Sequence, residues 1–168
     1  MTRTIADMDA RLNLDFEEPM KPLKKVAFYP GSFNPWHEGH ADVLDKALEL
    51  FDHVVIAPMT NPTKSDAVIG MNLPTGPESK YGDQISVFSL DSGLMVDAIS
   101  DWEKMSGSKI SAVLRGLRNG HDLQYEMNLQ YWNEDLGLKV PVVYFVTDRK
   151  LAHISSSAIR ALRGVKRR

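Results

Sequence analysis

Two histidines and a glycine follow the first apolar segment of the chain with a spacing that suits phosphate binding. His37 and His40 lie on either side of Gly39 within PGSFNPWHEGH, at the start of a predicted helix. Residues three apart share one face of a helix, and a helix N-terminus offers unpaired N–H groups to an anion. We therefore predict that both imidazoles and the Ser32 hydroxyl donate to phosphate. A zinc pair is the alternative interpretation, although no cysteine lies nearby.

A pair of arginines follows a later apolar segment and indicates the same chemistry. Arg115 and Arg118 flank Gly116 at the end of a predicted strand. A guanidinium group binds phosphate oxygens through two parallel hydrogen bonds. An isolated arginine most often forms a surface salt bridge, whereas two arginines at a predicted ligand-binding edge favour a phosphate site.

Three further polar positions are less distinctive when each is taken alone. The run Ser155 to Ser157 begins a predicted helix, where capping explains one hydroxyl and a second phosphate cradle would use all three. Lys64 follows a predicted strand, and alone its charge is explained by solvation on a polar loop. Glu126 lies in the first turns of a predicted helix, where a carboxylate also stabilises the helix dipole.

Short apolar segments alternate with amphipathic ones from residue 25 onward. The predicted strands are 25–30, 53–59, 84–90, 111–117 and 141–147, and the predicted helices are 38–51, 94–105, 122–136 and 155–162. This alternation predicts an α/β fold in which a five-stranded parallel sheet has helices on both faces. Such sheets bind ligands beyond the C-terminal ends of their strands, which is where the polar residues above lie.

Composition limits the class of protein. The chain has 168 residues, a net charge of −2 and no cysteine. These values exclude a disulfide framework and a cysteine nucleophile, and they argue against a generally basic nucleic-acid binder. No signal peptide or long apolar run is evident, so we expect a cytoplasmic protein with no membrane or nucleic-acid partner. We predict a loosely ordered or briefly helical extension over 1–22, one domain over 23–168, and a long loop over 65–83.

Five segments together resemble a known family. The segment 30–40, with its Pro-Gly-Ser-Phe-x-Pro and final Gly-His, resembles the entry motif of the HxGH nucleotidylyltransferases. The segment 115–126 contains RGLRN, then Asp, then Tyr-Glu, and resembles the signature of the phosphopantetheine adenylyltransferases among them. The segments 61–64, 93–97 and 154–157 resemble that family's lysine segment, its Gly-Leu-containing segment and its closing ISSS.

The resemblance implies a Rossmann-like nucleotidylyltransferase fold and an enzyme that moves AMP from ATP to 4′-phosphopantetheine. The products would be dephospho-coenzyme A and pyrophosphate. Mg²⁺ would accompany the ATP, with no metal site formed by the protein itself. The resemblance also implies a homo-oligomer, a hexamer in the family.

The same resemblance assigns roles to individual residues. Those expected to bind ATP are Ser32, Phe33, His37, His40, Gly116, Arg118, Glu126, Ser155, Ser156 and Ser157. Those expected to bind the acceptor are Ser32, Lys64, Leu94, Met95 and Arg115. Those expected to act in catalysis are His40, Lys64 and Arg118. For Leu94 and Met95, a place in the hydrophobic core is the alternative interpretation.

Three other functions remain open from the sequence. His37 and the ending with Arg160 are more typical of nicotinamide mononucleotide adenylyltransferases, so that acceptor is one alternative. A different phosphate acceptor, including a phosphorylated alcohol in a cytidylyl transfer, is another. A nucleotide-binding protein without catalytic activity is the third, although His40, Lys64, Arg115 and Arg118 all argue for catalysis.

Overall fold

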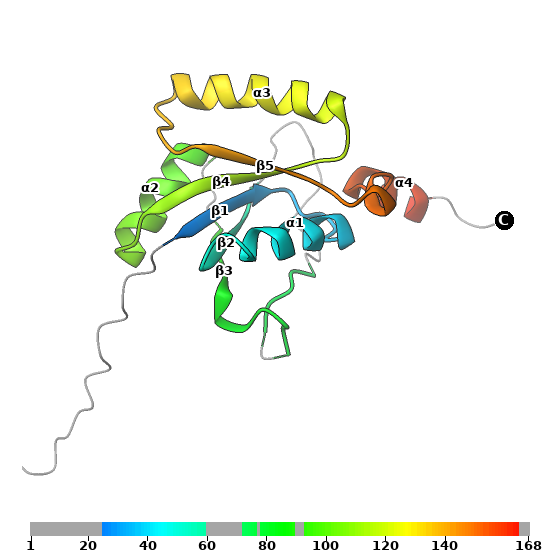
Figure 1. Cartoon of the computed structure of the whole chain (residues 1–168), viewed down its shortest axis with the longest axis horizontal. Helices are drawn as coiled ribbons and strands as arrows, with labels where there is room; N and C mark the ends of the chain where they lie inside the picture. The colour runs from blue at the N-terminus through cyan, green and yellow to red at the C-terminus, as the bar shows by residue number, and fades with distance from the viewer. Residues whose placement is uncertain (1–24, 60–71, 77, 90–92, 165–168) are drawn as a thin grey trace, which may run out of the picture.

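The computed structural model describes residues 25–59, 72–76, 78–89 and 93–164 (Figure 1). The predicted extension 1–22 lies outside the described residues. So do Lys64 and much of the predicted loop 65–83. No helix among the described residues is long and apolar enough to cross a membrane.

Five parallel strands form one sheet in the order β3-β2-β1-β4-β5. They are β1 (Val26–Gly31), β2 (His53–Pro58), β3 (Ile85–Val87), β4 (Ile110–Leu117) and β5 (Val142–Val146). The central strand β1 is apolar because it is covered on both faces, as parallel strands usually are. The predicted α/β fold class with a five-stranded parallel sheet is therefore confirmed.

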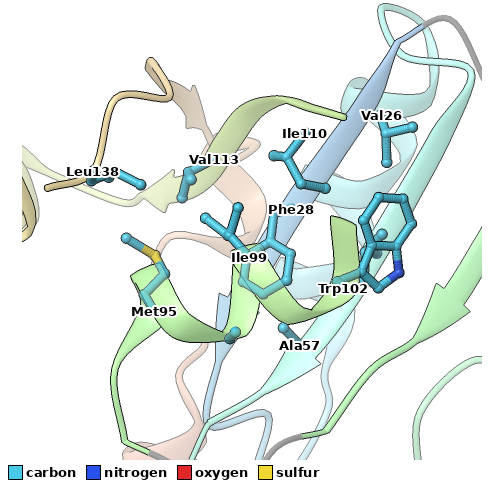
Figure 2. Close-up of a cluster of buried hydrophobic side chains, with 11 residues drawn as sticks. Val26, Phe28, Ala57, Met95, Ile99, Trp102, Ile110, Val113 and Leu138 are labelled. Atoms are coloured by element: carbon cyan, nitrogen blue, oxygen red, sulfur yellow. The ribbon is translucent and has the colours of Figure 1, made fainter. Parts of the chain in front are cut away.

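Helices cover both faces of the sheet, as predicted (Figure 1). They are α1 (Glu38–Leu48), α2 (Met95–Ser106), α3 (Gly120–Asp135) and α4 (Ser156–Gly164). Side chains of α1 pack with alternate residues of β1 and β2 in one apolar cluster. Side chains of α2 pack on the opposite face in a second cluster, in which Ile99 and Trp102 lie against Phe28 and Val26 (Figure 2). Because side chains of a strand alternate between faces, β1 contributes to both clusters.

The order in which the strands are connected defines where a ligand can bind to the sheet. The connection from β1 leads to β2 on one side, while the next strand in the sheet on the other side is β4. This point, where neighbouring strands connect in opposite directions, is the switch point of an open α/β sheet. The C-terminal ends of β1 and β4, at Gly31 and Leu117, therefore flank the expected ligand crevice.

Some predicted boundaries need correction. The strand predicted over 84–90 is only three residues long, and a short 3₁₀ helix, η3 (Gly82–Gln84), precedes it at the junction of the predicted loop and strand. A second 3₁₀ helix, η4 (Arg149–Leu151), follows β5 and was not predicted. The last helix begins at Ser156, because Ser155 accepts a hydrogen bond from the Ala158 N–H as a capping residue does.

Candidate active site

A cavity of about 390 Å³ lies at the C-terminal ends of β1 and β4, as the topology requires. Its wall combines four parts of the chain: the end of β1, the start of α1, the β4–α3 connection and the segment that leads into α4. It brings together Ser32, Phe33, His37, His40, Arg115, Gly116, Arg118, Glu126, Ser155, Ser156 and Ser157. Residues as far apart in the sequence as Ser32 and Ser157 thus line one site.

The histidine corner consists of Phe33, Trp36, His37 and His40, where β1 leads into α1. The rings of His37 and His40 stack with centroids 3.7 Å apart and planes 19° apart. His40 also lies against Phe33 and Trp36, with centroids 5.0 Å and 5.2 Å away. Within the part of the chain that the structure describes, the buried Nδ1 atoms of His37 and His40 have no hydrogen-bond partner.

Burial keeps both of these imidazoles neutral. It lowers the pKa of His40 to about 3, with further lowering by His37 and Arg118. The pKa of His37 is also lowered, by burial and by the Arg118 charge. A neutral imidazole carries a single N–H, so each ring can donate one hydrogen bond to a phosphate.

Glycines shape this corner by making room for aromatic rings. A Cβ at Gly31 would lie 2.9 Å from the Phe33 ring, and one at Gly39 would lie 3.1 Å from the His37 ring. Phe33 itself has a positive φ of 44°, which is uncommon for a residue other than glycine. At Gly39, the His37 imidazole occupies the space that a larger side chain would need.

Arg118 forms a close ion pair with Asp122 at the start of α3. Its Nε and Nη2 each donate to Asp122 over 2.8 Å, and its backbone N–H donates to the same carboxylate over 2.9 Å. Asn119 caps the helix by accepting from the N–H groups of His121 and Asp122. The Arg118 guanidinium lowers the pKa of the Asp122 carboxyl, so both groups are charged at neutral pH.

Arg115 is held less tightly than Arg118. Its Nε lies 3.2 Å from Glu126 Oε2, and its Nη1 lies 3.5 Å from the Pro30 carbonyl oxygen. The two paired side chains are 21% and 17% exposed. Burial raises the pKa of Glu126, while the Arg115 charge lowers it.

The three serines make different interactions. Ser155 caps α4, Ser156 donates over 3.0 Å to the Pro35 carbonyl, and Ser157 accepts from Arg160 over 3.2 Å. Arg160 also donates to the Asn34 carbonyl. The side chains of α4 therefore fasten this helix to the segment between β1 and α1, and they close one side of the cavity.

The remaining predicted residues have separate outcomes. Met95 is buried and lines a smaller second cavity of about 10 Å³, which shares Arg115 and Glu126 with the main one. Leu94 is 44% exposed at the start of α2, so its interpretation as a core residue is wrong. It also lies outside both linings, as far as the described residues define them. Lys64 lies outside the described residues.

Several side chains at or beside the site had no role in the sequence-based assignment, Asp122 in the wall and Trp36 behind His40 among them. Asp122 lies in the signature segment, and its spacing of four from Arg118 is a signal for an ion pair that could have been used. Trp36 packs against His40, four residues along the chain at the start of α1.

The donor set of the cavity favours anions over metal ions. Among residues 25–59, 72–76, 78–89 and 93–164, no group of three or more His, Asp or Glu side chains could hold a metal ion. The two carboxylates in the wall, Asp122 and Glu126, are each paired with an arginine. What remains for a ligand is a set of guanidinium, imidazole, hydroxyl and backbone N–H donors, which is the chemistry that recognises phosphate groups.

Comparison with known proteins defines the class. A model of the cytidylyltransferase-like family matches residues 28–162, which run from within β1 to within α4. The chain belongs to this family of nucleotidyltransferases. A solved structure assigned as a nicotinate-nucleotide adenylyltransferase from Vibrio parahaemolyticus has the same fold, with a TM-score of 0.53 and 20% identity over 86% of this chain and 90% of that one.

Curated relatives narrow the class further. A phosphopantetheine adenylyltransferase from Streptococcus uberis is 35% identical over 141 residues, covering 82% of this chain and 81% of the relative. Phosphopantetheine adenylyltransferases from Clostridium novyi and Streptococcus pneumoniae are 31% and 32% identical over 81% and 82% of this chain, and 81% and 83% of their own lengths. Within the family, the chain is thus similar to the phosphopantetheine adenylyltransferases, as the motifs predicted.

Proposed function

We propose that this protein is an adenylyltransferase that moves AMP from ATP to 4′-phosphopantetheine, giving dephospho-coenzyme A and pyrophosphate. The observation that carries the proposal is the convergence of His40, Arg115, Arg118 and the serine segment on one cavity. The relatives named phosphopantetheine adenylyltransferase support this acceptor over others.

The reaction needs no nucleophilic side chain of the protein. A phosphate oxygen of the acceptor forms a bond to the α-phosphorus of ATP. The bond from that phosphorus to the bridging oxygen breaks, and its electron pair leaves with pyrophosphate. Such transfers are catalysed by positioning the two reactants and by stabilising the charge that moves between them.

His40 would act on the phosphorus that is transferred. It is neutral and surrounded by Phe33, Trp36 and His37, so its N–H donor is fixed in a poorly solvated place. A hydrogen bond from such a donor strengthens as charge develops on the α-phosphate oxygens. Because Nδ1 is buried, we infer that Nε2 carries the proton and faces the substrate.

The cations of the site would bind the phosphates at either end of the reacting group. Arg118 would contact the phosphates of ATP, and Arg115 the phosphate of the acceptor. The unpaired N–H groups at the start of α4, with the Ser157 hydroxyl, would contact the β- and γ-phosphates. Lys64 is proposed to bridge the transferred phosphate and the acceptor, on the resemblance of its segment alone.

Mg²⁺ does not fit a cage formed by the described side chains, since the carboxylates of the cavity are both paired with arginine. We propose that it arrives bound to the triphosphate and to water, as Mg²⁺ commonly does. Assembly into a homo-oligomer and a cytoplasmic location remain predictions.

The test is pyrophosphate release from Mg²⁺-ATP with 4′-phosphopantetheine and with nicotinamide mononucleotide in parallel. Release with 4′-phosphopantetheine alone is the expected result. Release with nicotinamide mononucleotide alone would support the second candidate acceptor, which the presence of His37 and Arg160 favours. ATP binding without release in either reaction would indicate a binding protein or an untested acceptor.

A further inference from the structure

We propose that Asp42 is a positioning residue for the ATP phosphates. It holds the connection between β5 and α4 at a fixed place relative to the helix that carries His40, so that His40 and the α4 N-terminus act on the same triphosphate. This inference rests on the proposed function, because it takes the α4 N-terminus as a phosphate-binding element. Asp42 is absent from the cavity wall that the described residues form, so it acts through other groups.

The Asp42 carboxylate joins α1 to the segment that follows β5 (Figure 1). Its Oδ2 accepts a hydrogen bond of 3.0 Å from the Asp148 backbone N–H, 106 positions away in the sequence. The same oxygen accepts from the Lys46 ammonium over 2.8 Å, and this ammonium also donates to the Val146 carbonyl oxygen over 2.7 Å. The Asp42 side chain is only 18% exposed. One turn of α1 is thus linked to the residues on either side of Thr147.

The end of β5 needs such an anchor because β5 is an edge strand. It pairs with β4 on one side only, and Val146 at its end is exposed. Thr147 donates to the Leu117 carbonyl oxygen through its N–H over 2.9 Å and through its hydroxyl over 3.2 Å, which holds the chain toward β4. Loss of the Asp42 contact would leave Lys46 alone to hold this point toward α1.

Local hydrogen bonds carry the position of Asp148 along the connection to the serines. The Leu151 N–H donates to the Asp148 carbonyl oxygen over 2.8 Å, and the Ile154 N–H donates to the Leu151 carbonyl oxygen over 2.9 Å. The next residue, Ser155, caps α4. Leu151, Ile154 and the serines all line the main cavity. A displacement at Asp148 would therefore shift the unpaired N–H groups at the start of α4.

The far end of the same connection has its own attachment. Ser156 and Arg160 donate to the carbonyl oxygens of Pro35 and Asn34, in the segment before α1. Because α4 keeps these contacts, loss of the Asp42 anchor should misplace the phosphate-binding groups rather than abolish them.

The reaction makes this placement important. In the proposed mechanism, His40 acts on the α-phosphate while the α4 N-terminus binds the β- and γ-phosphates. These phosphates are joined covalently, so their donors have to lie at one fixed separation. A misplacement of about 1 Å can lower turnover about a hundredfold. Asp42 follows His40 by two residues on α1, and it thereby couples the two sets of donors. Arg115 lies on β4 and does not depend on this coupling.

The test compares ATP with the acceptor in the full chain. For Asp42→Ala, we expect the dissociation constant of ATP to rise about tenfold and kcat to fall at least as much, because a charge-assisted hydrogen bond is lost. The dissociation constant of 4′-phosphopantetheine should change less than about twofold. Asp42→Asn keeps an oxygen that accepts from the Asp148 N–H, so it should bring ATP affinity back to within about threefold of the parent. Calorimetry with each ligand and pyrophosphate release measure these effects.

A second carboxylate on α1 provides a matched control. Asp45 pairs with the Lys80 ammonium over 2.9 Å, and both side chains are exposed. Neither residue lies in the cavity wall that the described residues form. Asp45→Ala should therefore keep kcat and both dissociation constants within about twofold of the parent.

Substitutions at Asp148 test the backbone N–H itself and give a second measurement if Asp42→Ala does not fold. Asp148→Pro deletes this donor, and the φ of −53° at the position is one that proline adopts. Asp148→Ala keeps the donor, while both variants lose the carboxylate that accepts from the Lys150 N–H. Asp148→Pro should therefore weaken ATP binding about tenfold relative to Asp148→Ala.

Three results would overturn the proposal. Equal weakening of ATP and 4′-phosphopantetheine binding in Asp42→Ala would make Asp42 a residue of general stability. Unchanged ATP affinity in Asp42→Ala, or in Asp148→Pro relative to Asp148→Ala, would mean that the connection keeps its place without this contact. Asp42→Asn as weak as Asp42→Ala would assign the effect to charge. If the unaltered chain binds ATP but releases no pyrophosphate, the proposed function fails separately, and the ATP dissociation constants still decide the role of Asp42.

Discussion

The histidine corner and the arginine pair Arg115 and Arg118 are two solutions to phosphate recognition within one cavity. The histidine corner is aromatic and partly buried, and its imidazoles are neutral because burial lowers the pKa values of His37 and His40. The arginines lie at the other side of the β1–β4 switch point, partly exposed and each paired with a carboxylate. One side of the site therefore offers neutral donors, and the other offers permanent charge.

This difference implies a division of labour. A permanent cation attracts a phosphate in the substrate almost as strongly as in the transition state, so it contributes mainly to binding. A neutral donor in a poorly solvated place gains most when new charge develops in front of it, so it contributes mainly to turnover. The variants below test this division, starting with the largest expected effect.

Substitution of His40 by alanine should affect turnover far more than binding. We expect kcat to fall about 10²–10³-fold, which is typical for the loss of one donor to a developing oxyanion. The dissociation constant of ATP should change less than about fivefold, because the arginines and the α4 N-terminus remain. Pyrophosphate release under saturating substrates measures the first, and calorimetry with ATP measures the second.

A matched variant checks that the loss of kcat comes specifically from the histidine corner. His153 is an exposed histidine before α4 and is absent from the cavity wall, so His153→Ala should keep the parent's turnover. If His40→Ala weakened ATP binding as much as turnover, the histidine corner would be a binding element and the division would be wrong.

The arginine pair should show the converse behaviour. Arg115→Ala should raise the KM for the acceptor about tenfold to hundredfold, since a charge-assisted hydrogen bond contributes about 1.5–3 kcal/mol. The KM for ATP should change much less. Arg118→Ala should raise the KM for ATP more than the KM for the acceptor, because Arg118 is assigned to ATP. Steady-state kinetics with each substrate varied in turn measures both, and equal losses for the two substrates would remove the distinction between the arginines.

The fold and the location of the site were predictable because they depend on local patterns. Apolar segments of four to eight residues that alternate with amphipathic ones specify a parallel α/β sheet, and the sheet fixes where ligands bind. The β3 strand was overestimated, because the apolar segment 84–90 does not reveal how few of its residues pair with β2. Helix boundaries differed by a few residues, since capping residues such as Ser155 look like helix residues in the sequence.

The contacts within the site were much less predictable. The residue types of the histidine motif and of the RGLR segment identify donors to phosphate, and the structure places them in one cavity. Their partners depend on the relative position of helices that are distant in sequence. The Arg115–Glu126 pair, for example, requires knowledge of how α3 lies on the sheet.

Gly116, on β4, lies close to α1, so its substitution tests how tightly the two sides of the site are packed against each other. The expected effect is smaller than those above. A Cβ at this position would lie 2.9 Å from Val43 Cγ2, on the helix that carries His40. Because Val43 is buried and branched, Gly116→Ala should cost about 1–3 kcal/mol of unfolding free energy by overpacking. Urea denaturation measures it.

The double variant Gly116→Ala with Val43→Ala makes this test specific. If the clash is the cause, its destabilisation should be less than the sum of the two single effects, because the smaller side chain at 43 makes room for the new methyl group. Additive costs would mean that α1 and β4 are not tightly packed against each other at this point, and that the two sides of the site can move independently.

The two sides should also lose stability in different pH ranges. The pKa of His40 is about 3 in the folded protein, below its value of about 6.5 in an unfolded chain. Between these values the unfolded state binds more protons, so acidification from about pH 6.5 destabilises the fold, by at most about 1.4 kcal/mol per pH unit for this residue. The Asp122 pKa is lowered too, but from about 3.9, so the Arg118–Asp122 pair should lose its contribution only below about pH 4.

The variants His40→Asn and Asp122→Asn separate these two ranges. His40→Asn should flatten the dependence of unfolding free energy on pH between about 6.5 and 4, whereas Asp122→Asn should leave that range unchanged and flatten the dependence below about 4. His37 and His53, whose pKa values are also lowered chiefly by burial, add further slope in the first range that remains in both variants. Urea denaturation at several pH values measures the slopes. An unchanged slope above pH 4 in His40→Asn would mean that the imidazole is already protonated in the fold, and the neutral donor assigned to the histidine corner would then be lost as an explanation for turnover.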